Sequence, residues 1–141
     1  MIKLGVNSIL FRDFDFATAA KYIAWAGYSG IEVSAIKSMC EHLELEKWPE
    51  QAAGVKSIAD EAGLELLSME VATQDPERLE LAFAAAAAIG IPVVNIGPGG
   101  KTDAEGQLEE QTANIASLAA MAERYGVTLC VKAHVGQAIY N

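Results

Sequence analysis

The sequence has few basic residues, few cysteines and few aromatic residues. Its 141 residues include 10 Lys and Arg against 19 Asp and Glu, which gives a formal charge of −9 and a pI near 4.6. Proteins that follow nucleic-acid phosphates need a basic face, so we expect no nucleic-acid partner. Two cysteines, Cys40 and Cys130, are too few for a disulfide framework and favour a reducing, cytoplasmic location.

The sequence also has no targeting or membrane signal. Residues 1–5 have neither the charged nor the apolar region of a signal peptide. The longest apolar stretch, residues 81–96, is mostly alanine and is interrupted by Gly90 and Pro92, so it is too short and too broken to span a bilayer. Hydrophobic residues make up 52% of the chain, enough for one core. We expect a single domain over residues 1–141 and no membrane partner.

Four glycines divide the sequence into similar units. Each follows an alanine-rich amphipathic stretch and precedes a short apolar run, and these glycines are Gly27, Gly63, Gly90 and Gly126. Glycine just past a helix end adopts the left-handed conformation at little cost, so it commonly ends helices. The apolar runs predict strands over residues 31–34, 64–71, 91–96 and 127–133, and residues 2–9 predict a fifth strand before them.

Start signals precede the helices between these strands. Asp15 can cap a helix over 16–26, and Asp75 followed by Pro76 opens a helix that runs to Ile89. Pro49 lies early in a helix that ends at Ala62, and Thr102 or Asp103 can start the longest helix, which ends near Tyr125. Strands that alternate with helices of this length indicate right-handed crossovers and a parallel sheet.

The length of the chain decides between two parallel α/β folds. A closed barrel of eight units needs about 250 residues, whereas this chain holds four units and a fifth strand. A five-stranded doubly wound domain fits the length but would usually end on a helix that covers the last strand. We therefore favour part of a TIM barrel, about five strands and four helices of a (β/α)8 barrel. Its open edge strands predict a homodimer or higher oligomer.

Polar residues occur at the carboxyl ends of all five predicted strands. Period-two alternation places Lys132 and His134 on one face of the last strand, and Leu66, Ser68 and Glu70 on one face of the third. The other strands contribute Asn7, Glu32 and Asn95. Ligands bind at this end of parallel α/β folds, so these residues are candidates for a site.

Each candidate also has a structural interpretation. Glu70 and Lys132 can form an ion pair inside a barrel, and Glu32 can cap a loop or lie in solvent. Asn7 and Asn95 can satisfy backbone groups, and His42, in the loop after the second strand, can be a surface histidine. The glycine-rich segment 97–101 fits either a phosphate-binding nest or a tight turn.

Four segments resemble the xylose isomerase-like TIM barrels. They are Gly27-Tyr28-Ser29-Gly30-Ile31-Glu32-Val33, Ser68-Met69-Glu70, Val94-Asn95-Ile96-Gly97-Pro98-Gly99 and Cys130-Val131-Lys132-Ala133-His134. The resemblance covers the N-terminal half of that barrel. The superfamily includes sugar-phosphate isomerases and epimerases, inosose dehydratases and endonuclease IV; two histidines and a charge of −9 argue against the endonuclease branch.

The resemblance implies proton transfer on a small sugar or polyol, assisted by a divalent metal (Mn, Mg or Zn). The family holds this metal with a glutamate at the end of the fifth strand and with residues of later strands. Lys132 occupies the glutamate position here, so the metal is in doubt and this chain alone is expected to lack a complete catalytic set. Lys132 can instead supply the positive charge.

The leading hypothesis is therefore a sugar or sugar-phosphate isomerase or epimerase. In it Glu70, Lys132 and His134 are catalytic, and the substrate-binding residues are Asn7, Glu32, His42 and Asn95. One alternative is a lyase in which Lys132, with a depressed pKa, forms a Schiff base. The other is a non-catalytic half-barrel that self-assembles or binds a ligand.

Overall fold

The computed structural model describes residues 3–140, which form a parallel sheet with helices between its strands. The strands of the sheet are β1 (Gly5–Asn7), β2 (Gly30–Ile36), β4 (Glu65–Glu70), β5 (Val93–Ile96) and β6 (Thr128–Val131). The helices are α1 (Phe16–Trp25), α2 (Trp48–Ala62), α3 (Pro76–Ile89) and α4 (Gln107–Arg124). The shorter elements are η1 (Ser8–Phe11), β3 (Cys40–Glu41) and η2 (Leu45–Lys47).

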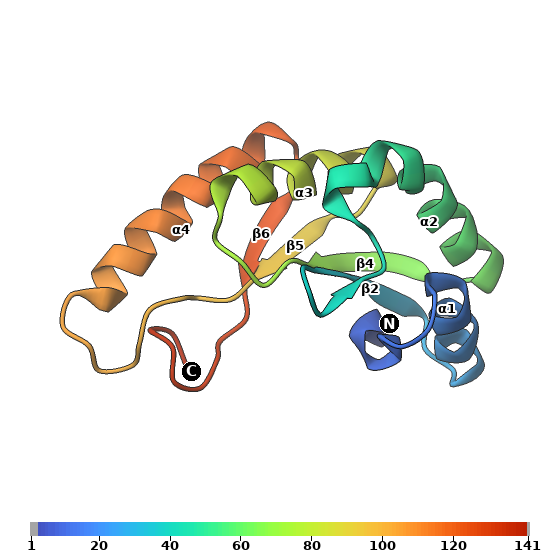
Figure 1. Ribbon diagram of the computed structural model, residues 1–141, viewed down its shortest axis with the longest axis horizontal. Coiled ribbons are helices and arrows are strands. Elements are labelled where there is room, and N and C mark those ends of the chain that lie inside the picture. Colours follow the sequence, from blue (N-terminus) through green and yellow to red (C-terminus); the bar gives the residue numbers. More distant parts are fainter. Residues whose placement is uncertain (1–2, 141) are drawn as a thin grey trace.

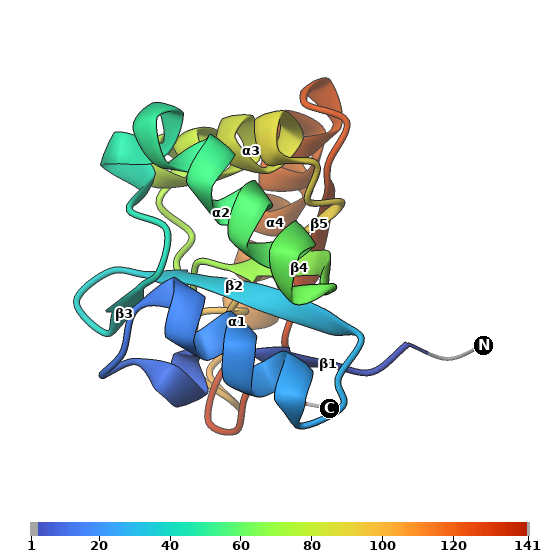
Figure 2. The ribbon, with the colours of Figure 1, turned by 90° about the vertical axis from the view of Figure 1, so that its right-hand side faces the viewer.

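The sheet follows the order expected for part of a barrel. Its parallel strands run β1-β2-β4-β5-β6, and β3 pairs antiparallel with β2. The helices follow one another along the outer side of the curved sheet (Figure 1). Figure 2 views the same sheet from its β1 end, with α1 in front. The predicted fold class, parallel βα units forming part of a TIM barrel, is confirmed.

The predicted helix boundaries are correct for three of the four helices to within one residue. Asp15 accepts a hydrogen bond from the Thr18 backbone N–H at 2.7 Å, and Asp75 accepts one from the Glu77 N–H at 3.2 Å. Helices α2 and α3 end at glycines in the left-handed region, Gly63 with φ 70° and Gly90 with φ 92°. Capping chemistry therefore sets where these helices start and stop.

The start of α4 and the extent of the first strand were predicted wrongly. Helix α4 begins at Gln107 rather than after Thr102 or Asp103, because Asp103 has a left-handed φ of 57° that a helix cannot contain. Strand β1 ends at Asn7 because its side chain accepts a hydrogen bond from the Ile9 N–H at 2.8 Å and starts η1 instead. Residue 2 of the predicted strand lies outside the described residues.

The core lies between the sheet and the helices. In β2 the side chains of Ile31, Val33 and Ala35 are fully buried, as is Met69 in β4. Alternation then directs the residues between them to the concave side of the sheet. The hydrophobic face thus fixes which polar side chains meet there. No helix within residues 3–140 is long and apolar enough to cross a bilayer.

A register shift in β4 corrects the predicted alternation of that strand. Ile31 pairs with Leu66 and Glu32 pairs with Ser68, so Leu67 is an extra residue, as in a β-bulge. Leu66 consequently packs against the core, and it does not share a face with Ser68 and Glu70 as expected. The Leu67 side chain lies over the backbone of Gly5 and Gly30, where an added Cβ would overlap its Cδ1.

We predict that Gly30→Ala destabilises the fold by about 1–3 kcal/mol, because the new methyl group collides with Leu67. Urea unfolding measures the change. The matched control is Gly54→Ala in α2, where no atom lies within 4 Å of the new methyl group and about 0.5–1 kcal/mol of stabilisation is expected. Adding Leu67→Ala to Gly30→Ala should recover part of the loss. Equal stability of the Gly30 and Gly54 variants would contradict this packing.

Candidate functional site

Side chains from all five parallel strands meet on the concave side of the sheet, with Glu32 at the centre. The Oε1 atom of Glu32 accepts hydrogen bonds from Ser68 Oγ at 2.8 Å and from Asn95 Nδ2 at 2.5 Å. Its Oε2 atom accepts hydrogen bonds from Asn7 Nδ2 and Lys132 Nζ, both at 2.6 Å. One carboxylate thus connects β1, β2, β4, β5 and the residue that follows β6.

Lys132 joins Glu32 to a second carboxylate. Its Nζ atom lies 2.9 Å from Glu70 Oε2, so the ammonium group bridges the two glutamates. Asn7 also donates to Glu70 Oε2. Glu32 pairs with Ser68 in register and Glu70 with Ser34, which places Glu70 nearer the carboxyl ends of the strands. Lys132 is the most accessible of the three side chains: it is 42% exposed, against 12% for Glu32 and 19% for Glu70.

The register and the backbone explain why these residues meet. Asn7 and Glu32 are partners in the β1–β2 ladder, and Glu70 and Asn95 are partners between β4 and β5. The Lys132 backbone N–H donates to the Ile96 carbonyl at 2.9 Å, which continues the β5–β6 ladder by one residue. The five strand ends therefore converge as predicted, although Lys132 lies 100 residues from Glu32 along the chain.

The two charges stabilise each other. Burial alone would raise the pKa of Glu32, but hydrogen bonds from Lys132 and Ser68 hold that pKa below its ordinary value of 4.5. Burial would lower the pKa of Lys132, but its hydrogen bonds to Glu32 and Glu70 raise that pKa above 10.5. A Schiff-base lysine needs a depressed pKa. This site therefore argues against the lyase alternative.

The three predicted catalytic residues line one pocket at the carboxyl ends of the strands. The pocket has a volume of about 370 Å³, and Glu70, Lys132 and His134 lie in its wall with apolar residues such as Ile36 and Met39. Pockets of this size hold small ligands. The structure thus brings one carboxylate, one ammonium group and one imidazole to the same cavity.

A turn after β6 positions His134. Its backbone N–H donates to the Ile139 carbonyl at 3.1 Å, and its own carbonyl accepts from the Gln137 N–H at 3.0 Å. The exposed ring places Nδ1 3.1 Å from the Val135 carbonyl oxygen. This contact uses Nδ1, and the other ring nitrogen, Nε2, has no hydrogen-bond partner among the described residues.

The remaining predicted residues differ in how much of their polar surface is available. Asn7 uses its whole amide, since Oδ1 accepts from Ile9 and Nδ2 donates to both glutamates. Asn95 donates through Nδ2 only, and its Oδ1 has no partner within residues 3–140. His42 does not join the cluster: its Nδ1 lies 2.9 Å from Ser8 Oγ and its Nε2 lies 3.0 Å from the Phe14 carbonyl. Those contacts hold the His42 ring beside Ser8 and Phe14, and substrate binding by His42 stays a prediction.

The described residues do not form a divalent metal site. Within residues 3–140, no three His, Cys, Asp or Glu side chains are grouped closely enough to hold an ion. Glu32 and Glu70, which are oxygen ligands by chemistry, both bind the Lys132 ammonium group. An ammonium group has no lone pair to coordinate a metal, and it repels one. Lys132 supplies the cation at this place.

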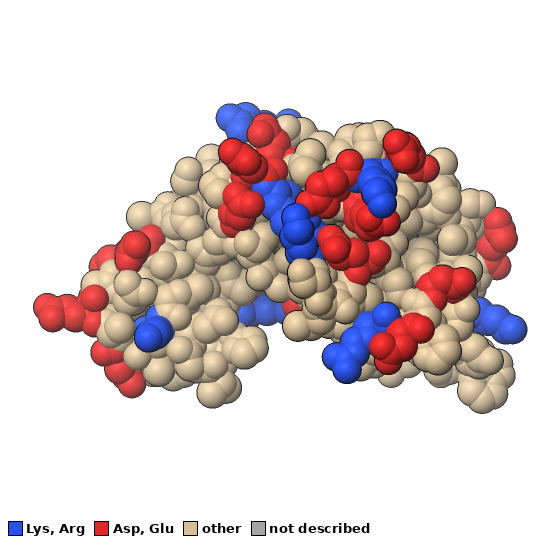
Figure 3. All heavy atoms as spheres, in the orientation of Figure 1, with Lys and Arg blue, Asp and Glu red and all other residues tan. Residues whose placement is uncertain are grey.

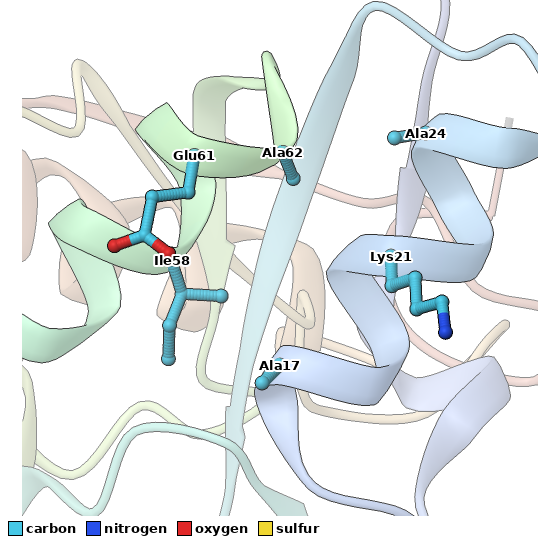
Figure 4. Close-up of a pocket in the computed structure, with 6 residues that line it drawn as sticks. All are labelled: Ala17, Lys21, Ala24, Ile58, Glu61 and Ala62. Atoms are coloured by element: carbon cyan, nitrogen blue, oxygen red, sulfur yellow. The ribbon is translucent and has the colours of Figure 1, made fainter.

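Two surface features lie outside this site. A groove of about 320 Å³ runs between α1 and α2, and Figure 4 shows its two charged side chains, Lys21 and Glu61, pointing away from each other. It therefore has no converging polar groups of the kind that orient a substrate. On the face drawn in Figure 3, basic side chains are scattered among acidic ones and form no continuous basic surface.

Ser68, which the sequence places on the same face as Glu70, donates to Glu32, and the bulge at Leu67 sets its position. Three glutamines of this region carry no signal in the sequence. Gln74, Gln111 and Gln137 come from three separate segments and line a second pocket beside the first. Their side chains follow no strand periodicity, so the sequence carries no signal that would group them.

Comparison with known proteins identifies the family. The model of the xylose isomerase-like TIM barrel family matches residues 20–140. The chain therefore belongs to the xylose isomerase-like TIM barrels. No protein of curated function matches the sequence.

Solved structures share the fold at low sequence identity. A xylose isomerase-like TIM barrel protein from Mycobacterium smegmatis, in complex with magnesium, has a TM-score of 0.76 at 12% identity over 97% of this chain and 56% of its own. D-allulose 3-epimerase from Methylomonas sp. has a TM-score of 0.66 at 16% identity, and the match covers 98% of this chain and 54% of the epimerase. The probable 3-DHS dehydratase AsbF from Bacillus anthracis has a TM-score of 0.72 at 15% identity, and the match covers 96% of this chain and 54% of the dehydratase. The chain spans about half the length of these structures.

We predict that Lys132→Met raises the pKa of Glu32, because burial then acts without the opposing ammonium group. In the wild type, the lowered pKa means that Glu32 stabilises the fold above about pH 4.5 and loses this contribution as the pH falls through its own pKa. The difference in unfolding free energy between the two proteins should therefore shrink in acid. Carboxyl ¹³C NMR measures the pKa directly.

The matched control for this titration is Lys3→Met. Lys3 pairs with Glu65 at the other end of β4, where both side chains are 55% exposed. This change should leave the pKa of Glu32 unaltered. An unaltered Glu32 pKa in Lys132→Met would show that the bridge between the glutamates is absent in solution.

Proposed function

We propose that the chain provides the proton-transfer site of a sugar or polyol isomerase or epimerase, as the N-terminal part of its barrel. The observation that carries the proposal is the pocket in which Glu70, Lys132 and His134 meet at the carboxyl ends of the strands. That end is where the enzymes of this barrel class bind substrates. Fold relatives that are named as an epimerase and a dehydratase support sugar chemistry for the family.

The proposed reaction begins with proton removal by Glu70. A Glu70 carboxylate oxygen takes the proton from the carbon beside a substrate carbonyl, and the electron pair of the broken C–H bond moves to the carbonyl oxygen. Lys132 stabilises the resulting enediolate through its ammonium group. In an isomerisation, His134 donates a proton to the former carbonyl oxygen and takes the proton of the neighbouring hydroxyl group, and Glu70 returns its proton to the former carbonyl carbon. In an epimerisation, His134 donates a proton to the opposite face of the same carbon atom, and Glu70 keeps the proton that it removed.

The surrounding residues position this machinery. Glu32 holds the Lys132 ammonium group at 2.6 Å, and Asn7 binds both carboxylates. Asn95 can accept a hydrogen bond from a substrate hydroxyl through its free Oδ1. In this scheme Lys132 provides the positive charge.

Deuterium uptake tests the proposal. The complete product of the gene is incubated with ketohexoses in D2O, and proton NMR follows exchange at the carbon beside the carbonyl. Glu70→Gln and Lys132→Met should each slow exchange by about 10²–10⁴-fold, the usual contribution of acid–base groups. Glu65→Gln, an exposed change at the opposite end of β4, should leave the rate unchanged.

Two outcomes would contradict the proton-transfer site. Exchange that is unaffected by Glu70→Gln would remove the proposed base. Sugar binding without any exchange would instead support the alternative of a non-catalytic binding half-barrel.

The open edges of the sheet support a homo-oligomer. Within residues 3–140, β1 pairs only with β2 and β6 pairs only with β5. Large apolar side chains in the segment that follows β1 are exposed, including Leu10 at 71%, Phe14 at 61% and Trp25 at 83%. Surfaces of this kind mark interaction sites. We expect static light scattering to give a dimer or larger assembly, and a monomer mass would contradict this.

A cytoplasmic location remains a prediction. It rests on Cys40 and Cys130, which are both free thiols in the structure, with Cys40 buried. Free thiols are typical of reducing compartments.

A further inference from the structure

We propose that a second pocket binds a further neutral, hydroxyl-bearing group of the same substrate, so that the substrate is larger than a single sugar ring. This inference rests on the proposed function, because it concerns the ligand of the same site. The pocket has a volume of about 290 Å³. It is lined by Ala72, Thr73, Gln74, Gly97, Gly99, Gln111 and Gln137.

The two pockets adjoin each other. Ala72, Gly97 and Gln137 line both of them, and Ala72 lies two residues after Glu70. Both cavities lie at the carboxyl ends of β4 and β5. A substrate that places a carbon atom beside Glu70 can therefore extend into the second pocket past Gln137.

The lining of the second pocket is polar and uncharged. The chain contains five glutamines, and three of them lie here, together with the Thr73 hydroxyl. An amide both donates and accepts hydrogen bonds, as the hydroxyl groups of a sugar do. A phosphate or carboxylate would instead be matched by lysine, arginine or free backbone N–H groups. The chemistry of the wall thus selects a neutral polyol group.

The structure holds two of these amides in place and leaves donors free. Gln74 donates from Nε2 to the Gly97 carbonyl at 3.0 Å, and its Oε1 accepts from Asn114 Nδ2 at 2.6 Å. Gln137 Oε1 accepts from the Gly99 N–H at 2.9 Å, which leaves its NH2 group available. Gln111 has no hydrogen-bond partner within residues 3–140 and can turn towards a ligand.

The glycine-rich loop after β5 makes room for these amides. Gly99 has φ 67°, and a Cβ atom there would lie 2.6 Å from Gln111 Oε1 and 3.0 Å from Gln74 Nε2. Its N–H group, the donor that a phosphate nest would need, already binds Gln137. The loop therefore forms one side of a glutamine-lined pocket and does not present its Gly99 donor to an anion.

Side-chain amide NMR can observe both pockets at once. In ¹⁵N-labelled complete gene product, the NH2 signal of Asn7, which donates to Glu70, reports on the first pocket. The signals of Gln74 and Gln111, which line the second pocket and not the first, report on the second. The probes are D-fructose, isomaltulose (fructose linked through O6 to glucose) and inorganic phosphate. Fructose should shift the Asn7 signal and leave those of Gln74 and Gln111 in place. Isomaltulose should shift all three signals and bind at least about tenfold more tightly, a difference of about 1.4 kcal/mol.

Variants of α4 provide the matched comparison. Gln111→Ala should reduce the isomaltulose affinity to that of fructose and leave the fructose affinity unchanged. Gln107→Ala, one turn earlier on the same helix and outside the lining, should alter neither affinity.

The outcomes separate this inference from the proposed function. If isomaltulose shifts the Asn7 signal but leaves the Gln74 and Gln111 signals in place, or if phosphate shifts those two glutamine signals, the inference is wrong and the proton-transfer site stands. If no sugar shifts any of these signals, both are wrong. Deuterium exchange that depends on Glu70, measured separately, tests the proposed function whatever the result for the glutamines.

Discussion

The contact between Glu32 and Lys132 is the interaction on which the concave side of this sheet depends. A carboxylate that is 12% exposed costs free energy unless it is paired and hydrogen-bonded, and four donors from four other segments meet that requirement. Removing one partner would leave the other charged and half-buried. The pairing therefore constrains the positions of β1, β4, β5 and β6 around β2 at the same time.

The same pairing puts an ammonium group where the family resemblance implies a metal-binding glutamate. The neighbouring carboxylates, Glu32 and Glu70, both bond to this ammonium group. The positive charge is then a permanent part of the polypeptide and does not depend on the supply of an ion. The two glutamates that hold the Lys132 ammonium group also neutralise part of its charge, which weakens the electric field that a ligand meets.

Much of the fold could be predicted from sequence because local signals determine it. Asp15 and Asp75 act as caps, glycines end the helices, and alternation in β2 and β6 places Glu32 and Lys132 on the concave face. Features that depend on contacts between distant segments could not be predicted. The bulge at Leu67 follows from packing over Gly30, and His42 bonds to Ser8, 34 residues away. Neither contact leaves a periodic pattern in the chain.

Leu67 also makes the two sides of the polar layer different. Its side chain, over Gly5 and Gly30, lies beneath the polar layer on the side of the amino ends of the strands, and it shares a cavity of about 180 Å³ with Asn7, Glu32 and Ser68. This cavity brings a hydrocarbon wall to one side of Glu32, whereas the side that faces Glu70 carries the Lys132 ammonium group. The two sides of the central carboxylate therefore differ in polarity as well as in sequence.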